Sequence, residues 1–232
     1  TYKVMEFAGE AIEALSLDER MAITNMVVEA GAKTGLIAPD EKVFDYLQAI
    51  GADKGTPVYS DEDAVYSEVY EFDASQLVPQ VALPHEVDNV VDITEAAGEQ
   101  IDQAYLGSCT GGRYSDLEEA AKILKGHKVH PDVRFLVSPA SRSIYHKALR
   151  NGIIEILSDA GAMVLAPSCG ACLGLHSGIL AGGERAISST NRNFVGRMGH
   201  KTAEIFLASP AAVAAAAITG KITDPREFLQ EG

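Results

Sequence analysis

The sequence predicts an α/β fold of three layers, in which a mainly parallel sheet lies between helices. In the second part of the chain, short apolar runs alternate with stretches of helical pattern, and strands separated by such helices pair in parallel. The 232 residues are 47% hydrophobic, which is enough for a substantial core. The first part has a different pattern, so we expect an α/β region over residues 1–80 and an α/β/α domain over residues 81–232.

Two helices are predicted near the start of the chain. Ser16 and Glu19 form a capping box, in which each side chain satisfies a free backbone amide, and Gly31 can end that helix. Pro39 suits the first turn of a second helix, which has apolar residues at helical spacing and ends before Gly51.

Beyond residue 51 the pattern becomes extended. Residues 61–63 are a charged loop, and residues 68–73 alternate in polarity as a strand does. Pro79 and Pro84 bracket a further extended piece, so we place the boundary between the two regions near Gln80.

The second region is predicted to alternate strands with helices. Ligands of parallel sheets bind at the carboxyl ends of the strands, so the loops that follow these strands are expected to carry the chemistry. The predicted strands cover residues 104–106, 133–137, 162–166 and 187–190, and the predicted helices run from Ser115 or Asp116 to Gly126, over residues 141–150, and from Ser209 to Gly220.

The charge of the chain is negative and unevenly distributed. The net charge is −14, which repels polyanions, so nucleic acid is not expected as a partner. Residues 1–100 carry 5 basic and 21 acidic side chains, whereas residues 101–232 carry 14 basic and 12 acidic ones. An anion-binding site is therefore expected in the second region.

The sequence also predicts the surroundings of the protein. No apolar run approaches the roughly 20 residues that span a bilayer, so no membrane segment is expected. Three cysteines are too few for the disulfide framework of a small secreted protein, which favours the cytoplasm. The chain begins at Thr1 without an initiator methionine, and we expect it to be part of a longer gene product.

All three cysteines come just after predicted strands. Cys109 follows the strand at residues 104–106, while Cys169 and Cys172 follow the strand at residues 162–166. The thiols should therefore gather at one edge of the sheet, among small residues that allow a cluster to approach the backbone closely. Three thiolates suit an iron–sulfur cluster in which one iron lacks a protein ligand, because the common clusters take four cysteines.

The residues alone leave three other interpretations of the cysteines open. With His176 as a fourth ligand, the three thiols would form a closed zinc site. Cys169 and Cys172 by themselves have the spacing of a dithiol redox pair. All three thiols could also be buried and inert.

Two pairs of polar residues are candidates for substrate binding and catalysis. Arg192 and Arg197 lie five residues apart across a glycine and can direct both guanidinium groups to one pocket, which suits a di- or tricarboxylate. Asn25 and Glu29 lie four residues apart on the first predicted helix and should share one face of it. The alternatives are a solvated loop for the arginines and an ordinary surface pair for Asn25 and Glu29.

Four segments of the chain, in order, resemble motifs of the aconitase superfamily, and within it the large subunits of the 3-isopropylmalate dehydratase and homoaconitase type. They are residues 20–32, residues 107–110 (Gly-Ser-Cys-Thr), residues 168–174 (Ser-Cys-Gly-Ala-Cys-Leu-Gly) and residues 191–197 (Asn-Arg-Asn-Phe-Val-Gly-Arg). Residues 224–229 resemble the terminus of a separate large subunit. One departure is Gly111, where the family usually has Asn.

The resemblance implies a role for each candidate residue. The cysteines would ligate a [4Fe–4S] cluster, and the other candidates would contact the substrate or the open iron of that cluster. The implied metal ligands are Cys109, Cys169 and Cys172, the implied substrate-binding residues are Arg192, Arg197 and Asn191, and the implied catalytic residues are Asn25 and Glu29.

The resemblance also implies a reaction and partners. The expected reaction is the dehydration and rehydration of a 2- or 3-hydroxy di- or tricarboxylate, with isopropylmalate in leucine biosynthesis preferred to homoaconitase or methylmalate/citramalate dehydratase chemistry. The expected partners are the amino-terminal half of a large subunit, which carries acid–base His and Asp residues, and a small swivelling subunit in a heterodimer or heterotetramer. A non-catalytic iron–sulfur or zinc scaffold is the alternative.

Overall fold

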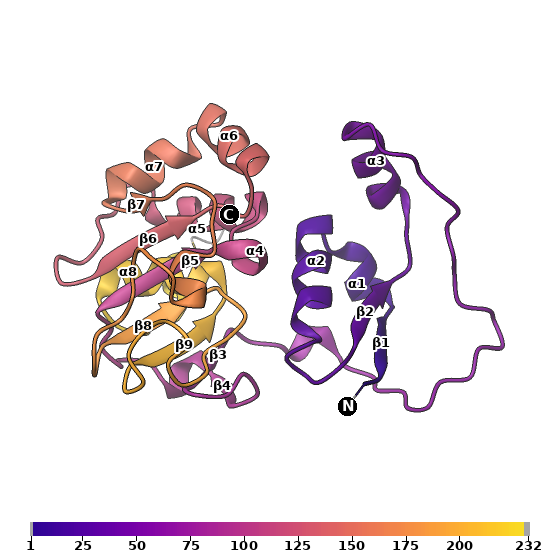
Figure 1. Ribbon diagram of the computed structural model, residues 1–232, viewed down its shortest axis with the longest axis horizontal. Coiled ribbons are helices and arrows are strands. Elements are labelled where there is room, and N and C mark those ends of the chain that lie inside the picture. The colour runs from indigo at the N-terminus through magenta and orange to yellow at the C-terminus, as the bar shows by residue number, and fades with distance from the viewer. Residues whose placement is uncertain (1, 230–232) are drawn as a thin grey trace. The chain divides into compact units, whose positions relative to one another are not determined.

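The computed structural model describes residues 2–229 and divides into two compact units, Thr1–Leu77 (unit 1) and Val78–Gly232 (unit 2). Figure 1 shows helices and strands in both units, and the predicted α/β class is confirmed. The assignment of residues 1–80 and 81–232 to two aconitase-type domains stays a prediction.

Unit 1 contains a two-stranded sheet that the sequence patterns did not predict. Its strands are parallel, with Val4 opposite Thr34 and Phe7 opposite Ile37. Its elements are β1 (Val4–Phe7), α1 (Glu10–Ala14), α2 (Leu17–Met26), β2 (Thr34–Ile37), α3 (Glu41–Ala49) and the 3-10 helix η1 (Ala74–Gln76).

Helix α2 begins where the sequence predicts and ends earlier. The capping box is present, because the Glu19 amide donates to Ser16 Oγ and the Ser16 amide donates to Glu19 Oε2 at 2.7 Å. The prediction that the helix continues to Gly31 is wrong. After Met26 the chain closes in tight turns that end at Gly31, whose φ of 80° takes the backbone out of the helix. Asn25 therefore lies in the last turn of α2 and Glu29 lies beyond it.

One buried charge joins the helices of unit 1. The Arg20 side chain is 4% exposed, and its Nη2 donates to the Glu13 carbonyl at 2.8 Å and to Asp40 Oδ2 at 2.7 Å. Asp40 also begins α3, because its side chain accepts from the amides of Lys42 and Val43. The hydrogen bond from Arg20 holds the pKa of the Asp40 carboxyl below its ordinary value.

The segment after α3 is irregular. Residues 61–63 lie in a turn, as predicted, but the strand predicted at residues 68–73 is wrong. These residues have no partner strand among the described residues, and an extended segment without one leaves its backbone groups to water. Val65 and Phe72 are 97% and 85% exposed.

Unit 2 is built on a seven-stranded sheet whose order is β4-β3-β9-β8-β5-β6-β7. The five strands from β9 to β7 are parallel, and β3 and β4 are antiparallel at one edge, so the prediction of a mainly parallel sheet is confirmed. The strands are β3 (Gln80–Ala82), β4 (Val90–Asp92), β5 (Gln103–Gly107), β6 (Arg134–Ser138), β7 (Met163–Val164), β8 (Arg185–Ser188) and β9 (Glu204–Ala208).

In unit 2, the predicted helix starts are correct where a serine side chain caps the first turn. Ser141 begins α6 and Ser209 begins α8, each accepting from the amide three residues on, and Gly220 ends α8. The predicted N-cap at Ser115 or Asp116 is wrong by two or three residues: the N-cap of α5 is Arg113, the helix begins at Tyr114, and Asp116 accepts from the Arg113 amide. The helices are α4 (Ser108–Gly111), α5 (Tyr114–Leu124), α6 (Arg142–Arg150), the unpredicted α7 (Ile153–Ala160) and α8 (Pro210–Thr219), with 3-10 helices η2 (Ile93–Glu95), η3 (Gly170–Leu173) and η4 (Pro225–Glu227).

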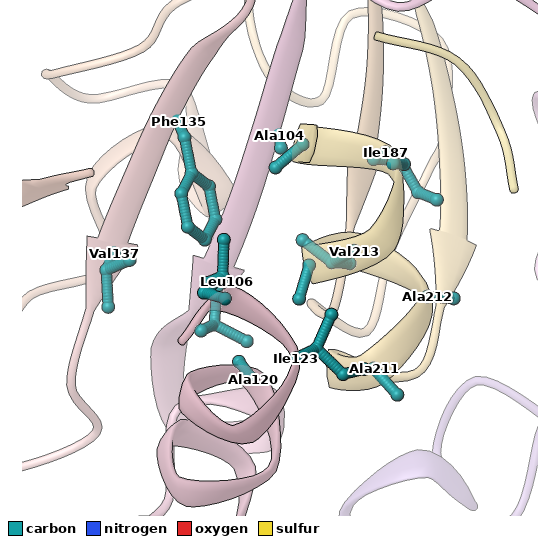
Figure 2. Close-up of a cluster of buried hydrophobic side chains, with 14 of the residues drawn as sticks. Ala104, Leu106, Ala120, Ile123, Phe135, Val137, Ile187, Ala211, Ala212 and Val213 are labelled. Carbon is teal, nitrogen blue, oxygen red and sulfur yellow. The ribbon is translucent and has the colours of Figure 1, made fainter. Parts of the chain in front are cut away.

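The main core lies between the sheet and helices α5, α7 and α8. Figure 2 shows Leu106 from β5 facing Ile123 from α5 and Val213 from α8, and all three side chains are fully buried. The alanines of α8 are buried along its whole length, and their small side chains let the helix approach β5 and α5 closely. This packing holds β5 at the centre of the unit.

The opposite face of the sheet is covered differently. We expected helices on both faces, but residues 165–184 and 189–203 cover this face with loops and η3. Tyr105 and Leu136 pack there against Ala171 and Cys172. Among the described residues, no helix is both long and apolar enough to cross a membrane.

We expect the Arg20–Asp40 pair to stabilise unit 1. Asp40→Asn keeps an oxygen that can cap α3 but removes the charge opposite a buried guanidinium, so local opening should become easier by about 1–3 kcal/mol. Asp40→Ala should cost more because it also removes the cap. Hydrogen exchange of peptides over residues 10–45 measures both effects.

The pH dependence gives the control. Because the pKa of Asp40 is lowered in the folded state, the stabilisation is complete above the ordinary carboxyl pKa and is lost as the pH falls through the lowered value. The difference between wild type and Asp40→Asn should therefore shrink below about pH 4. A difference that persists unchanged at lower pH would contradict the ion-pair explanation.

Candidate functional site

The first cysteine lies on a tight turn at the carboxyl end of β5. Cys109 is exposed in the one-turn helix α4, which starts directly after Gly107. Ser108 has a φ of 71°, which is uncommon for a residue with a side chain and costs about 1 kcal/mol. A Cβ at Gly107 would collide with the backbone of Ser138. The turn therefore packs closely against the end of β6.

The other two cysteines flank η3. Cys169 is exposed and precedes η3, whereas Cys172 is 4% exposed within it. Gly170 has a φ of 45°, and a Cβ there would lie 2.9 Å from Tyr105 Oη. Gly174 ends η3 with a φ of 66°. The backbone conformation beside these cysteines therefore favours glycine at both positions, and the close approach of Tyr105 leaves no room for a side chain at Gly170.

Buried polar groups at the ends of β5 and β6 hold both cysteine loops. Ser138 Oγ donates to the Ser168 carbonyl at 2.9 Å, and Tyr105 Oη donates to the Cys169 carbonyl at 3.3 Å. Ser138 also contacts Gly107, at the start of the Cys109 turn. The two loops therefore meet at one edge of the sheet, as the sequence predicts.

The phenol of Tyr105 is fully buried beneath these loops. Burial raises the pKa of Tyr105 to about 12, a hydrogen bond with Ser138 opposes that shift, and the thiols of Cys172 and Cys169 add to it. The phenol therefore stays protonated and can donate its hydrogen bond throughout the neutral range.

The arginine loop contacts the cysteine loop directly. It follows β8, and Asn191 Oδ1 lies 4.0 Å from Cys172 Sγ. Arg197 Nε donates to the Cys172 carbonyl at 2.6 Å. Asn191, Arg192 and Arg197 are all partly buried. Asn191 and Arg197 therefore both contact Cys172, and Arg192 lies between them in the same loop.

The two predicted catalytic residues lie in the other unit. Asn25 and Glu29 are both partly buried, Asn25 at the end of α2 and Glu29 in the turns that follow. They do not share a helix face, because the helix ends between them. Their roles stay a prediction.

The loops offer a donor set that fits an iron–sulfur cluster. Three thiols lie on two adjacent loops, and the buried hydroxyls of Ser108 and Ser168, which precede Cys109 and Cys169, have no hydrogen-bond partner among the described residues. Hydroxyls in such places can donate to cluster sulfides. No three His, Cys, Asp or Glu side chains in the described part of the chain gather around the position of a single metal ion. A four-iron cluster takes each thiolate on a different iron, so its ligands surround a larger group.

A cavity of about 540 Å³ in unit 2 lies away from these residues. It is lined in part by His85, Glu95 and Phe206, and none of the predicted site residues lines it. Arg185 in its wall is paired with Glu99 at 2.9 Å and with Glu204 at 2.7 Å. Two carboxylates already surround Arg185, the one arginine among the described residues that line the cavity, so the cavity does not suit a dicarboxylate.

Some residues of the site carry no chemical motif in the sequence. Tyr105 and Ser138 stand in apolar strands, and a polar residue at such a position is the one signal that could have drawn attention to them. At Gly111, where the chain departs from the family's Asn, a Cβ would collide with the Ser189 carbonyl and lie 2.5 Å from Ser189 Oγ.

Comparison with known proteins identifies the family of the chain. The model of the aconitase family (aconitate hydratase) matches residues 1–220. The chain belongs to the aconitase family.

Its relatives within the aconitase family include large subunits of one enzyme. The chain is 56% identical over 228 residues to the 3-isopropylmalate dehydratase large subunit of Halothermothrix orenii, with 98% of this chain and 54% of the relative covered. It is 51% identical over 229 residues to 3-isopropylmalate dehydratase large subunit 1 of Methanopyrus kandleri, with 99% and 55% covered. This aconitase-family chain spans about half the length of the curated relatives it matches. The resemblance drawn from the four motifs is confirmed.

We expect Tyr105→Phe to loosen the Cys169 loop by about 1 kcal/mol, because the Cys169 carbonyl loses its donor. The raised pKa also predicts a pH effect. An unfolded phenol ionises near pH 10 and the folded one near 12, so this contribution to stability is complete below pH 10 and is lost as the pH rises through 12.

Urea unfolding between pH 8 and pH 11 measures this effect. The free energy of unfolding should fall less steeply above pH 10 in Tyr105→Phe than in wild type. Tyr46→Phe, at an exposed position on α3, is the matched control and should behave as wild type. Equal slopes in all three proteins would show that Tyr105 is not buried as described.

Proposed function

We propose that this aconitase-family chain is the cluster-bearing part of a hydro-lyase large subunit that isomerises a hydroxy dicarboxylate, 3-isopropylmalate, by dehydration and rehydration. The observation that carries the proposal is the contact between the cysteine loop and the arginine loop, made by Cys172, Asn191 and Arg197. It puts anion-binding side chains beside a group of thiols. The names of the relatives support isopropylmalate as the substrate.

In this proposal Cys109, Cys169 and Cys172 hold a [4Fe–4S] cluster through their thiolates. The hydroxyls of Ser108 and Ser168 donate to its sulfides, which supplies the partners that these buried groups lack. When bound, the cluster supplies an open iron, a Lewis acid that polarises the hydroxyl of the substrate and makes it a better leaving group.

The arginines hold the carboxylates of the substrate. The proton that is lost lies next to a carboxylate and is weakly acidic. By the resemblance to the aconitase superfamily, a base of the small subunit would take this proton, and negative charge accumulates on the carboxylate as the proton leaves. A guanidinium presents two parallel donors that match both carboxylate oxygens. The bond from Arg197 Nε to the Cys172 carbonyl fixes the direction of that guanidinium.

Asn25 and Glu29 act on the hydroxyl side of the substrate. The Glu29 carboxyl can give a proton to the departing hydroxyl and take it back on rehydration, and the Asn25 amide can orient that hydroxyl by hydrogen bonds. Both residues lie in the part of the chain that the family model matches and are partly buried, which supports a role inside the assembled protein.

The proposed partners are the remaining part of a large subunit and a small subunit. Within the described part of unit 1, the buried side chains are Arg20, Val27 and Ala32, and every residue of its two parallel strands is exposed or only partly buried. Parallel strands are normally buried on both faces, so unit 1 needs further protein to cover it. The three free cysteines support a reducing compartment, the cytoplasm.

Substrate class is tested on the complete large subunit with its small subunit. Dehydration of isopropylmalate, citramalate and homocitrate is followed by the absorbance of the enoate product. We expect isopropylmalate to be used with a kcat/KM at least about tenfold above the others, since a methylene difference in a pocket is worth 1–3 kcal/mol. Equal or greater activity on another acid would move the assignment to that dehydratase.

The cluster is tested by anaerobic purification. We expect brown protein that contains iron and acid-labile sulfide, and we expect Cys109→Ser to lose the colour because one iron loses its ligand. His176→Ala is the discriminating control, since His176 belongs to the zinc interpretation alone. Colourless protein that holds one zinc, and loses it in His176→Ala, would contradict the cluster.

The arginines are tested by conservative substitution. Arg192→Lys and Arg197→Lys keep the charge but lose the paired donors, so kcat/KM should fall by about 10- to 1000-fold with the cluster absorbance unchanged. Arg150→Lys, at the exposed end of α6, is the matched control. Kinetics equal to those of the control would return Arg192 and Arg197 to an ordinary solvated loop.

A further inference from the structure

The side chain of Ser189 lies between the cysteine turn and the arginine loop. It is 6% exposed, and its Oγ accepts a hydrogen bond from the Gly107 amide at 3.0 Å and donates one to the Gly111 carbonyl at 2.9 Å. Gly107 precedes α4 and Gly111 is its last residue. One hydroxyl is therefore hydrogen-bonded to both ends of the turn that carries Cys109.

The backbone of Ser189 is fixed by the sheet. It follows β8 directly, and its amide donates to the Tyr105 carbonyl of β5 at 3.1 Å. Asn191 and Arg192 follow two and three residues later along the chain. The position of the Cys109 turn is thus tied to the first residues of the arginine loop through a single side chain.

The fit around this hydroxyl is close. A Cβ at Gly111 would collide with the Ser189 carbonyl and lie 2.5 Å from its Oγ, so no larger residue fits there without moving the turn. Both hydrogen bonds are buried, and loss of the acceptor would leave the Gly107 amide without its side-chain partner.

We propose that Ser189 is a positioning residue that sets the Cys109 turn relative to the arginine loop. Its hydroxyl uses its acceptor and its donor at once, so it fixes the two ends of the turn together. The consequence for catalysis rests on the proposed function: the same side chain would set the spacing between a cluster ligand and the residues that bind carboxylate.

The test compares Ser189→Ala with Ser188→Ala in the complete large subunit with its small subunit. Ser188 is also fully buried and also makes two hydrogen bonds, but both go to Thr190 beside it, at 3.0 Å and 3.2 Å. The two variants lose the same group at adjacent positions. They differ in whether the bonds reach the Cys109 turn.

Three measurements are made on each protein. In Ser189→Ala we expect hydrogen exchange at the Gly107 amide to be about tenfold faster than in wild type, because that amide loses its acceptor. We also expect chelator-driven release of iron to be about threefold faster and kcat to fall. In Ser188→Ala, exchange at Gly107 and iron release should match wild type.

The other possible outcomes would contradict either the positioning role of Ser189 or the proposed function. Gly107 exchange that is the same in Ser189→Ala and wild type would overturn the positioning role, even if activity fell. If Ser189→Ala does not fold, wild type alone still tests the bond, since exchange at Gly107 as fast as in an exposed loop would overturn it. Wild-type protein without iron and sulfide would overturn the proposed function and leave the exchange comparison as the test of Ser189.

Discussion

The structure of the site depends on one constraint: polar groups at the carboxyl end of a buried parallel sheet must find partners among the loops that leave it. β5 is covered on one face by α5 and α8 and on the other by loops, and the side chains of Tyr105, Ser138 and Ser189 near its end are at most 6% exposed. Tyr105, Ser138 and Ser189 therefore bond to the backbone of the cysteine loops. Ligands of such sheets bind at the carboxyl edge, and these hydrogen bonds fix the cysteine loops at that edge.

The sequence predicts what is decided locally. A serine that accepts from an amide three residues on needs no distant partner, so the starts of α2, α6 and α8 could be read from Ser16, Ser141 and Ser209. Alternation at residues 68–73 failed as a signal because a strand exists only with a partner, and none of the described strands pairs with these residues. The predicted end of α2 was wrong for a related reason. Gly31 lies five residues beyond Met26, and a glycine there allows the helix to end at more than one residue before it.

The same division applies to the site. The cysteines and arginines could be found because the chain carries them just after apolar runs, and the order of parallel strands brings such positions together. Ser189 could not be found, since its partners Gly107 and Gly111 are about eighty residues away and nothing near Ser189 in sequence indicates them. Motifs locate the groups that perform chemistry, whereas the groups that hold them in place are visible only when distant strands are paired.

The two units differ in the number of residues that each buries in its own core. This difference affects how firmly each unit holds the proposed site residues that it carries. Unit 2 has a large core, and Cys172, Asn191 and Arg197 of the proposed site contact one another within it. Unit 1 buries Val27, Ala32 and the Arg20 side chain among its described residues, and it leaves Val65 and Phe72 almost fully exposed. The residues proposed to bind metal and carboxylate thus belong to a unit that fixes their geometry by its own packing. Asn25 and Glu29, which are proposed to act on the substrate hydroxyl, belong to a unit with few buried residues of its own, so its own packing constrains their geometry less.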